Sequence, residues 1–338
     1  MCGISGIITL EHNQSQHEKL LDKIIDSQHN RGPDYRKKEI IHAEQATIYL
    51  GHNRLSVIDL SEHANQPMWD HSKRFCIVYN GEIYNYLELR QQLIELGYVF
   101  KTQSDTEVIL AAFSEWHIQA IEKFNGMFAF AIYDAKNRHV YFFRDRFAIK
   151  PLYYAKIGPT FYFASSSQVL AEKLKLQPNS DYLYAGLNYW RYEDNSARTA
   201  YQGLNCLLAG HYLALNLKDL QLSCQSYYDL RQGAQKWQEK FQQASLTDCA
   251  EILDYELTRS VTYRLRADVP IGISLSGGLD STSIAALANQ QHDNLIGLSF
   301  ATTEDRKSEG HLIAEFQKKH NFDVIYIDPK SEELVQSF

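Results

Sequence analysis

The sequence predicts two structural classes in succession. The first part is expected to be α+β, with layered, largely antiparallel sheets and helices outside them. The second is expected to be α/β with a parallel sheet. Short segments rich in β-branched and aromatic residues, separated by polar turns, fill the first ~215 residues. After residue 247, helices and buried strands alternate, as in parallel sheets.

The elements of the first part follow from local patterns. Strands are expected wherever β-branched and aromatic residues cluster between polar turns, at Gly3–Leu10, Thr47–Leu50, Phe75–Tyr79, Phe128–Tyr133, His139–Phe143 and Thr160–Ala164. Two amphipathic helices are expected at Tyr86–Leu96 and Thr106–Trp116. Asn80–Asn85 is interpreted as a strand-to-helix turn, and the short basic run Arg36–Lys38 as a solvated loop.

The second part has a different pattern of helices and strands. Residues 229–247 are rich in Gln, Lys and Ala, which places a boundary there. Helices and strands then alternate in the order 248–265, 271–275, 281–289, 295–300, 308–320 and 323–327. We therefore divide the chain into a first domain at 2–215, a linker at 216–247 and a second domain at 248–338. Only about three strands precede Phe338, so the second domain is expected to be truncated.

Composition excludes several classes of function. The formal net charge of −7 over 338 residues argues against nucleic acid as a main partner. No run reaches the ~18 apolar residues that would span a membrane, and no basic segment precedes the first apolar run. Five irregularly spaced cysteines suit neither a disulfide framework nor a zinc site. A reducing, cytoplasmic location is expected.

One set of residues in the first part suits the hydrolysis of an amino-acid amide. Removal of Met1 would place the thiol of Cys2 beside a free α-amine, which can act as its general base. Arg54 can grip an α-carboxylate, and Asp105 can hold an α-ammonium. Asn80 and Gly81 can form an oxyanion hole. Taken singly, Cys2 can be an ordinary cysteine, Asn80-Gly81 a turn and Asp105 a helix cap.

A glycine-rich turn in the second part suits phosphate binding. The expected strand 271–275 leads into Ser276-Gly277-Gly278-Leu279-Asp280-Ser281, and a helix follows. No Lys follows the glycines, so this is not a G-x-x-x-x-G-K-[ST] loop. Small residues before a helix N-terminus still let backbone N–H groups approach phosphate oxygens, and Asp280 can ligate Mg²⁺. The alternative is a glycine-rich turn that binds nothing.

The chain resembles the glutamine-hydrolysing asparagine synthetase family over nearly its whole length. In that family a class II glutamine amidotransferase domain, an N-terminal-nucleophile hydrolase, precedes an ATP-pyrophosphatase synthetase domain. Besides the Ser276–Ser281 turn, the resemblance rests on Met1–Ile4, Arg31–Asp34, Arg54–Asp59, Gln66-Pro67, Asn80–Asn85, Ser104-Asp105, Gly126–Ala131, Arg144–Tyr154 and Phe163–Ser165. The family usually has Gly at the position of Ala148, and Glu and Lys at those of Ser166 and Gln168.

The resemblance implies specific roles. Cys2 would attack the glutamine amide, with Asn80 and Gly81 stabilising the oxyanion. Arg54 would bind the glutamine α-carboxylate near the backbone of Val57 and Ile58, and Glu82 and Asp105 would hold the α-amine. ATP and its pyrophosphate would contact Ser274, Ser276, Gly277, Gly278, Asp280, Ser281 and Thr302, with Asp280 holding Mg²⁺.

By the same resemblance, ammonia from glutamine would displace AMP from aspartyl-AMP, giving asparagine, glutamate, AMP and pyrophosphate. Two alternatives stay open. One is another carboxylate acceptor, such as a sugar acid or a peptide. The other is a protein whose truncated synthetase half is inactive, either a glutaminase or a non-catalytic scaffold. Class II amidotransferases that build amino sugars or purine precursors are disfavoured by the Ser276–Ser281 loop, because they use phosphosugar domains. A homodimer is compatible with the resemblance.

Overall fold

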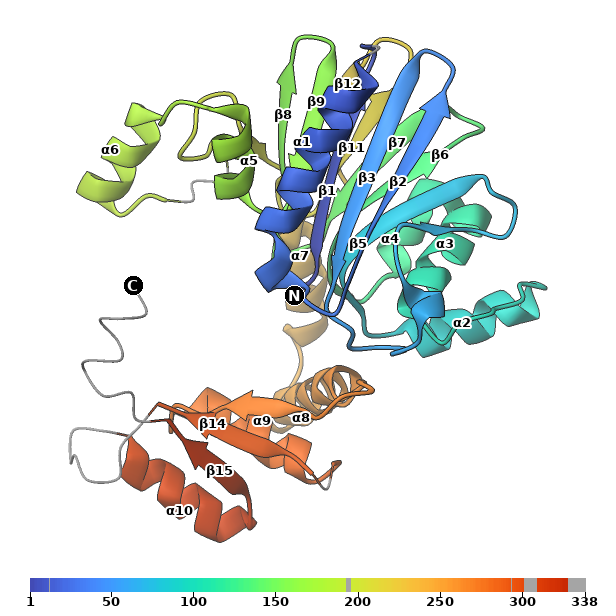
Figure 1. Ribbon diagram of the computed structural model, residues 1–338. Helices are drawn as coiled ribbons and strands as arrows, with labels where there is room; N and C mark the ends of the chain where they lie inside the picture. Colours follow the sequence, from blue (N-terminus) through green and yellow to red (C-terminus); the bar gives the residue numbers. More distant parts are fainter. Residues whose placement is uncertain (12, 193–195, 293, 301–308, 328–338) are drawn as a thin grey trace. The chain divides into compact units, whose positions relative to one another are not determined.

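A computed structural model describes residues 1–338 except 12, 193–195, 293, 301–308 and 328–338 (Figure 1). The chain divides into two compact units, residues 1–234 and 235–338. Each unit has its own sheets and its own hydrophobic core, so each can be described by itself.

Two six-stranded antiparallel sheets form the first unit. The first sheet has the strand order β10 (Asn205–Cys206), β8 (Tyr153–Ile157), β9 (Thr160–Ala164), β1 (Gly3–Thr9), β3 (Ala46–Arg54) and β2 (Tyr35–Ala43). The second has the order β12 (Leu222–Ser226), β11 (His211–Asn216), β7 (His139–Arg144), β6 (Gly126–Asp134), β5 (Phe75–Ile83) and β4 (Met68–Trp69).

The two sheets pack face to face, and helices cover their outer faces (Figure 1). Alternate residues of one strand serve the two faces, as the pleat requires. In β5, Cys76 and Val78 join the core between the sheets, whereas Ile77 and Tyr79 pack toward the helices. These helices are α2 (Tyr86–Glu95), α3 (Asp105–Trp116) and α4 (Ala120–Lys123). Helix α1 (Gln14–Ser27) covers the first sheet through Leu21 and Ile25.

This layered arrangement confirms the α+β class expected for the first part. Every expected strand and both expected helices are present, and the structure adds α1, α5 (Ser167–Leu174), α6 (Ser180–Tyr189) and the shorter strands. Two expectations are wrong. Arg36–Lys38 lies in β2 rather than in a loop, because an edge strand can carry exposed charged side chains. Asn80–Glu82 continues β5, because these residues pair with Met127–Ala129 of β6.

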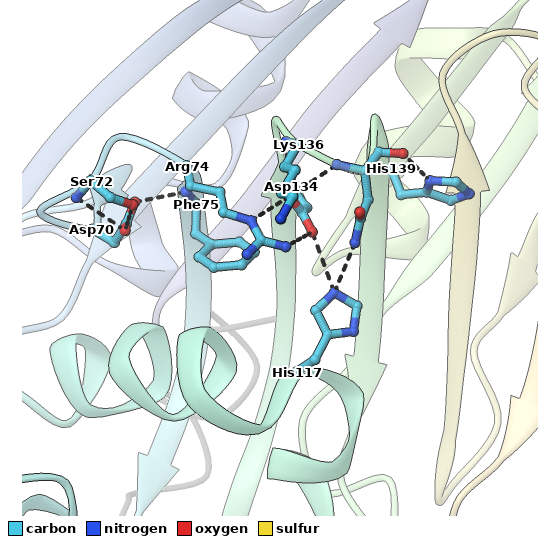
Figure 2. A network of polar contacts seen from close by, with 9 residues as sticks. Asp70, Ser72, Arg74, Phe75, His117, Asp134, Lys136 and His139 are labelled. Carbon is cyan, nitrogen blue, oxygen red and sulfur yellow. Dashed lines mark hydrogen bonds and ion pairs between the residues drawn. The ribbon is translucent and has the colours of Figure 1, made fainter. Parts of the chain in front are cut away.

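A buried carboxylate organises the turn that joins β6 to β7 (Figure 2). Asp134 is fully buried and accepts hydrogen bonds from Arg74 Nε at 3.0 Å and Nη2 at 2.9 Å, with His117 Nε2 at 3.3 Å. The N–H groups of Lys136 and Asn137 complete its shell. Burial opposes ionisation, but the His117 and Arg74 contacts hold the pKa of Asp134 well below its usual range. The carboxylate therefore fastens β5, β6 and the helical layer together.

The stretch expected as a linker, 216–247, contains ordered elements. Strand β12 lies within it and pairs with β11, which extends the first sheet-built unit beyond residue 215. Helix α7 (Leu230–Phe241) follows and spans the division between the two units. Helix α8 (Leu246–Arg264) begins at a capping box formed by Ser245 and Asp248.

The second unit contains a small parallel sheet, as expected. Its order is β13 (Gly272–Ser274), β14 (Ile296–Ser299) and β15 (Asp323–Tyr326), connected through α9 (Leu279–Asn289) and α10 (Gly310–His320). Leu275, Ala285, Ile313 and Phe322 belong to its core. None of the helices in the described ranges is long and apolar enough to cross a membrane.

Candidate active site

The ends of four elements meet at one cavity of the first unit. Because β1 and β3 are antiparallel, with Gly3 opposite Asn53, the start of β1 lies beside the end of β3. The end of β5 and the first turn of α3 form the other walls. Eight residues expected from the sequence line this cavity of about 100 Å³: Cys2, Arg54, Val57, Ile58, Asn80, Gly81, Glu82 and Asp105.

Cys2 lies at the cavity, half-buried, immediately before β1. Its Sγ is 3.4 Å from the backbone N of Leu55, which donates to it, and 3.6 Å from the Leu55 carbonyl oxygen. Arg31 Nε donates to the Cys2 carbonyl oxygen at 3.2 Å, which fixes the backbone. Burial raises the pKa of the thiol, whereas the Leu55 backbone contact lowers it. Burial therefore lowers the fraction of Cys2 present as thiolate, and the Leu55 backbone contact raises it.

Asn80 has a side chain that the protein leaves without a partner. The residue is only 1% exposed, and neither Nδ2 nor Oδ1 makes a hydrogen bond with any residue that the structure describes. A buried unpaired polar group costs ~1–3 kcal/mol, so such groups are rare unless a ligand satisfies them. Gly81 follows in the strand, where an added Cβ would lie 2.2 Å from the Met127 carbonyl oxygen. Its lack of a side chain is therefore a packing requirement.

Arg54 ends β3 and points its guanidinium at a loop. Nη1 donates to the Ser61 carbonyl oxygen at 2.7 Å and to Asn65 Oδ1 at 2.8 Å. Nη2 donates to the backbone carbonyls of Ile58, at 3.4 Å, and Asp59. All four acceptors are uncharged oxygens. The loop thus positions the cation, and a bidentate grip on a carboxylate would need some of these contacts to give way.

Asp105 is the first residue of α3, after the N-cap Ser104. Its Oδ2 accepts from Tyr79 Oη at 2.8 Å and from the Ile83 N–H at 3.0 Å. Burial raises the pKa of Asp105 to about 6, with these two donors opposing the shift and Glu82 adding to it. Two carboxyl groups therefore face one small cavity, an arrangement that suits a cation such as an α-ammonium.

Other residues of the cavity wall were not expected from the sequence. They are Leu55, Ala64, Gln66, Tyr79, Ser104, Thr106 and Lys150, with Met1 at the rim. Gln66 bridges two walls, because its Oε1 accepts from the Tyr79 N–H at 2.6 Å and its Nε2 donates to Thr106 Oγ1 at 3.1 Å. Gln66 and Lys150 both lie in stretches that carry the family resemblance, which was the only signal for them.

The Ser276–Ser281 turn of the second unit connects β13 to α9. Gly277 has φ +76°, a backbone conformation that favours glycine. Ser276 Oγ lies 3.2 Å from Ser281 Oγ, and Gly278 N–H donates to Ser276 Oγ at 3.4 Å. The loop is thus closed by its own hydroxyl groups ahead of the N-terminus of α9. Ser274 ends β13 at the same edge of the sheet.

The residues of this turn fit a phosphate group and one cation. The first N–H groups of an α-helix have no intrahelical partner and favour anions, and here glycines allow close approach. Asp280 is exposed in the first turn of α9. Within the described ranges no three His, Cys, Asp or Glu side chains are grouped to hold a metal. One carboxylate plus substrate phosphates is a usual Mg²⁺ environment. Thr302 lies outside the described residues.

Comparisons with known proteins assign both parts of the chain to known families. A family model described as a glutamine amidotransferase domain matches residues 1–228, and one described as asparagine synthase matches 253–338. A Methanocaldococcus jannaschii protein provisionally named a glutamine-hydrolysing asparagine synthetase is 30% identical, over 100% of this chain and 67% of that protein. Asparagine synthetase [glutamine-hydrolyzing] 1 of Bacillus subtilis is 32% identical, over 93% of this chain and 48% of that protein.

A solved structure supports the fold. Glutamine phosphoribosylpyrophosphate amidotransferase from B. subtilis has a TM-score of 0.50 at 14% identity, over 100% of this chain and 70% of that one. The present chain spans about half to two thirds of the length of its curated relatives. The chain therefore belongs to the glutamine-hydrolysing asparagine synthetase family, with an N-terminal-nucleophile hydrolase fold in its amidotransferase domain.

Proposed function

We propose that the first unit hydrolyses glutamine at Cys2, and that the ammonia amidates a carboxylate that ATP has activated, with aspartate as the first candidate acceptor. The observation that carries the proposal is the buried, unpartnered amide of Asn80 in the same cavity as the Cys2 thiol. A tetrahedral oxyanion would supply the hydrogen-bond acceptor that the Asn80 Nδ2 group lacks.

The cavity residues account for each step of amide hydrolysis. Cys2 sulfur attacks the side-chain carbonyl carbon of glutamine, and its proton passes to an α-amine that removal of the exposed Met1 would free. Asn80 Nδ2 and the Gly81 N–H stabilise the oxyanion. The α-amine gives this proton to the leaving nitrogen as collapse breaks the C–N bond, which releases ammonia and leaves a γ-glutamyl thioester. Water then hydrolyses the thioester to glutamate and restores the thiol.

Substrate positioning is assigned to the charged wall residues. Asp105 and Glu82 hold the α-ammonium, and Arg54 holds the α-carboxylate beside Val57 and Ile58. The match of residues 253–338 to asparagine synthase supports ATP as the second substrate. We assign its pyrophosphate to Ser274, Ser276–Gly278 and Ser281, and Mg²⁺ to Asp280. Five cysteines without disulfides support a reducing, cytoplasmic compartment.

Replacement of Cys2 tests the hydrolytic step. Cys2→Ala should abolish glutamate formation from glutamine, because no other thiol lines the cavity within the described structure. Cys224→Ala, at an exposed thiol of β12, is the matched control and should keep full activity. Glutamate is measured with and without ATP. Glutamine hydrolysis that survives in the Cys2→Ala protein would refute the proposal.

The acceptor needs a separate experiment. The protein is incubated with glutamine, ATP, Mg²⁺ and aspartate, and asparagine, AMP and pyrophosphate are quantified. Asparagine formation supports aspartate as the acceptor. AMP formation only with a sugar acid or a peptide acid would replace aspartate by that acceptor. Glutamate without AMP under all conditions would favour the third reading, a glutaminase with an inactive synthetase half.

A further inference from the structure

We infer that Lys150 is a positioning residue of the amidotransferase site, whose ammonium group stabilises the negative charge that develops on the Cys2 sulfur when its proton leaves. This inference rests on the proposed function of the same cavity. It begins from one observation: Lys150 is buried, with 5% of its surface exposed, and lines the cavity together with Cys2 and Glu82.

The loop that carries Lys150 is held rigidly from within. The buried carboxylate of Asp145 accepts from the backbone N–H groups of Phe147 and Ile149, both at 3.0 Å, and of Lys150 at 2.9 Å. The Arg144 guanidinium donates to the carbonyl oxygens of Lys150, at 2.8 Å, and Ala148, at 3.0 Å. Both side chains thus fix the backbone from which Lys150 projects.

The ammonium group of Lys150 makes neither a hydrogen bond nor a close ion pair with any residue in the described ranges. Because Lys150 is only 5% exposed and lines the cavity, an opposite charge that forms in the same cavity would stabilise its ammonium group. Burial lowers the pKa of Lys150, and Glu82 and Cys2 are the main groups that oppose this. A cation that shares one cavity with a thiol and a carboxylate suits a site that creates negative charge on sulfur.

Other groups around Cys2 raise or lower the pKa of its thiol. Burial raises the pKa of its thiol. The Leu55 N–H contact, the N-terminal amine and Lys150 lower it, whereas Asp105 raises it. Arg31 contacts the Cys2 carbonyl oxygen and also interacts with the sulfur charge. Lys150 and Arg31 are thus side-chain cations that interact with the sulfur charge, and the Nε of Arg31 is already bound to the backbone.

The test follows the reactivity of the Cys2 thiol with iodoacetamide as a function of pH in the full 338-residue chain. Lys150→Met removes the charge, Lys150→Gln removes it with a polar end retained, and Lys150→Arg keeps it. Lys19→Met, at an exposed position of α1, controls for loss of a lysine elsewhere. Peptide mass spectrometry separates Cys2 from Cys224, whose exposed thiol serves as an internal reference.

Loss of the Lys150 charge should move the pH midpoint of Cys2 alkylation upward by about one unit, because an opposite charge no longer favours the thiolate. Lys150→Arg and Lys19→Met should keep the wild-type midpoint, and Cys224 should be unchanged in all variants. The kcat for glutamine should fall about tenfold in Lys150→Met and Lys150→Gln, with KM within about threefold. A residue with a merely structural role would change the melting temperature and leave the Cys2 midpoint where it was.

The role of Lys150 and the proposed function of the cavity can be refuted independently of each other. If wild-type protein hydrolyses glutamine but Lys150→Met and Lys150→Gln leave the Cys2 midpoint unchanged, the role of Lys150 is overturned and the proposed function stands. If the midpoint moves as expected but no glutamate is ever formed from glutamine, the electrostatic role is upheld and the proposed function fails.

Discussion

The side chain of Asn80 separates a catalytic from a structural interpretation of the cavity. A buried amide without partners lowers stability, so evolution toward stability alone would replace it. In the proposed mechanism its Nδ2 group donates a hydrogen bond only when an oxyanion forms. Catalysis and stability therefore place opposite demands on this one residue.

Asn80→Ala should lower kcat for glutamine hydrolysis by about 10²–10³, the usual cost of losing one oxyanion-hole donor. The free energy of unfolding in urea should stay within about 1 kcal/mol of wild type, because the lost packing is offset by removal of an unsatisfied amide. Kinetics and urea unfolding on the same preparation check both parts. Full activity, or a stability loss of several kcal/mol that explains the inactivity, would contradict this assignment.

The raised pKa of Asp105 predicts a pH dependence. Burial is its main cause, and the free carboxyl should ionise near pH 6. Only the ionised form can pair with the α-ammonium of glutamine. The fall of kcat/KM for glutamine with decreasing pH should thus become steeper below about pH 6, by about a further tenfold per unit.

Two variants test whether Asp105 causes the fall in kcat/KM at low pH. Asp105→Asn should give a low kcat/KM at every pH, without the inflection near 6. Asp219→Asn, at an exposed turn outside the cavity, should keep the wild-type profile. The profiles are measured from pH 5 to 8. An unchanged inflection in Asp105→Asn would assign the titration to another group.

At the scale of elements, patterns in the sequence identified strands better than their ends. The strand in β5 was expected to stop at Tyr79, because Asn80-Gly81 is a local turn signal. Pairing of Asn80 and Gly81 with Ala129 and Phe128 overrides that signal and extends the strand into the cavity. Strand β2 was missed for a related reason, since its charged residues lie at a sheet edge.

Ala148 belongs to the loop that carries Lys150 and has φ +56°, in the left-handed region. The family usually has Gly here, and an L-residue pays about 1–2 kcal/mol for this conformation. Ala148→Gly should therefore stabilise the first unit by roughly 0.5–1 kcal/mol, after the added flexibility of the unfolded chain is subtracted. Urea unfolding measures the change.

Ala135→Gly is the matched control, because Ala135 is exposed and has a negative φ. This substitution should be neutral or destabilising by about 0.5–1 kcal/mol. Equal changes in the free energy of unfolding for Ala148→Gly and Ala135→Gly would show that the conformation of residue 148 carries no strain.

At the scale of the molecule, the sequence indicated the cavity through residues scattered over the first ~105 positions. Cys2, Arg54, Asn80 and Asp105 converge because the ends of β1, β3, β5 and α3 meet at one edge of the two sheets. Residue chemistry suggested their roles, but only the topology brings Lys150 to the same cavity. The composition shift at 229–247 contains the division after residue 234, whereas the domain limit of 215 leaves out β12.

The first unit should fold and hydrolyse glutamine by itself, provided that it extends to residue 234. Strand β12 pairs along β11, and Tyr227 Oη donates to the Arg144 carbonyl oxygen at 2.7 Å. Arg144 in turn holds the backbone of Lys150. A fragment 1–215 lacks both features and leaves β11 as an open edge, which favours aggregation.

Fragments 1–215 and 1–234 therefore make a matched pair. Fragment 1–234 should keep kcat and KM for glutamine within about twofold of the full chain, because every described wall residue of the cavity lies within it. Fragment 1–215 should melt at lower temperature, aggregate on warming and lose most of its kcat. Calorimetry, light scattering and glutamate assays measure these properties. Equal stability and activity of the two fragments would mean that β12 and Tyr227 add nothing to the unit, and that residues 1–215 suffice for it.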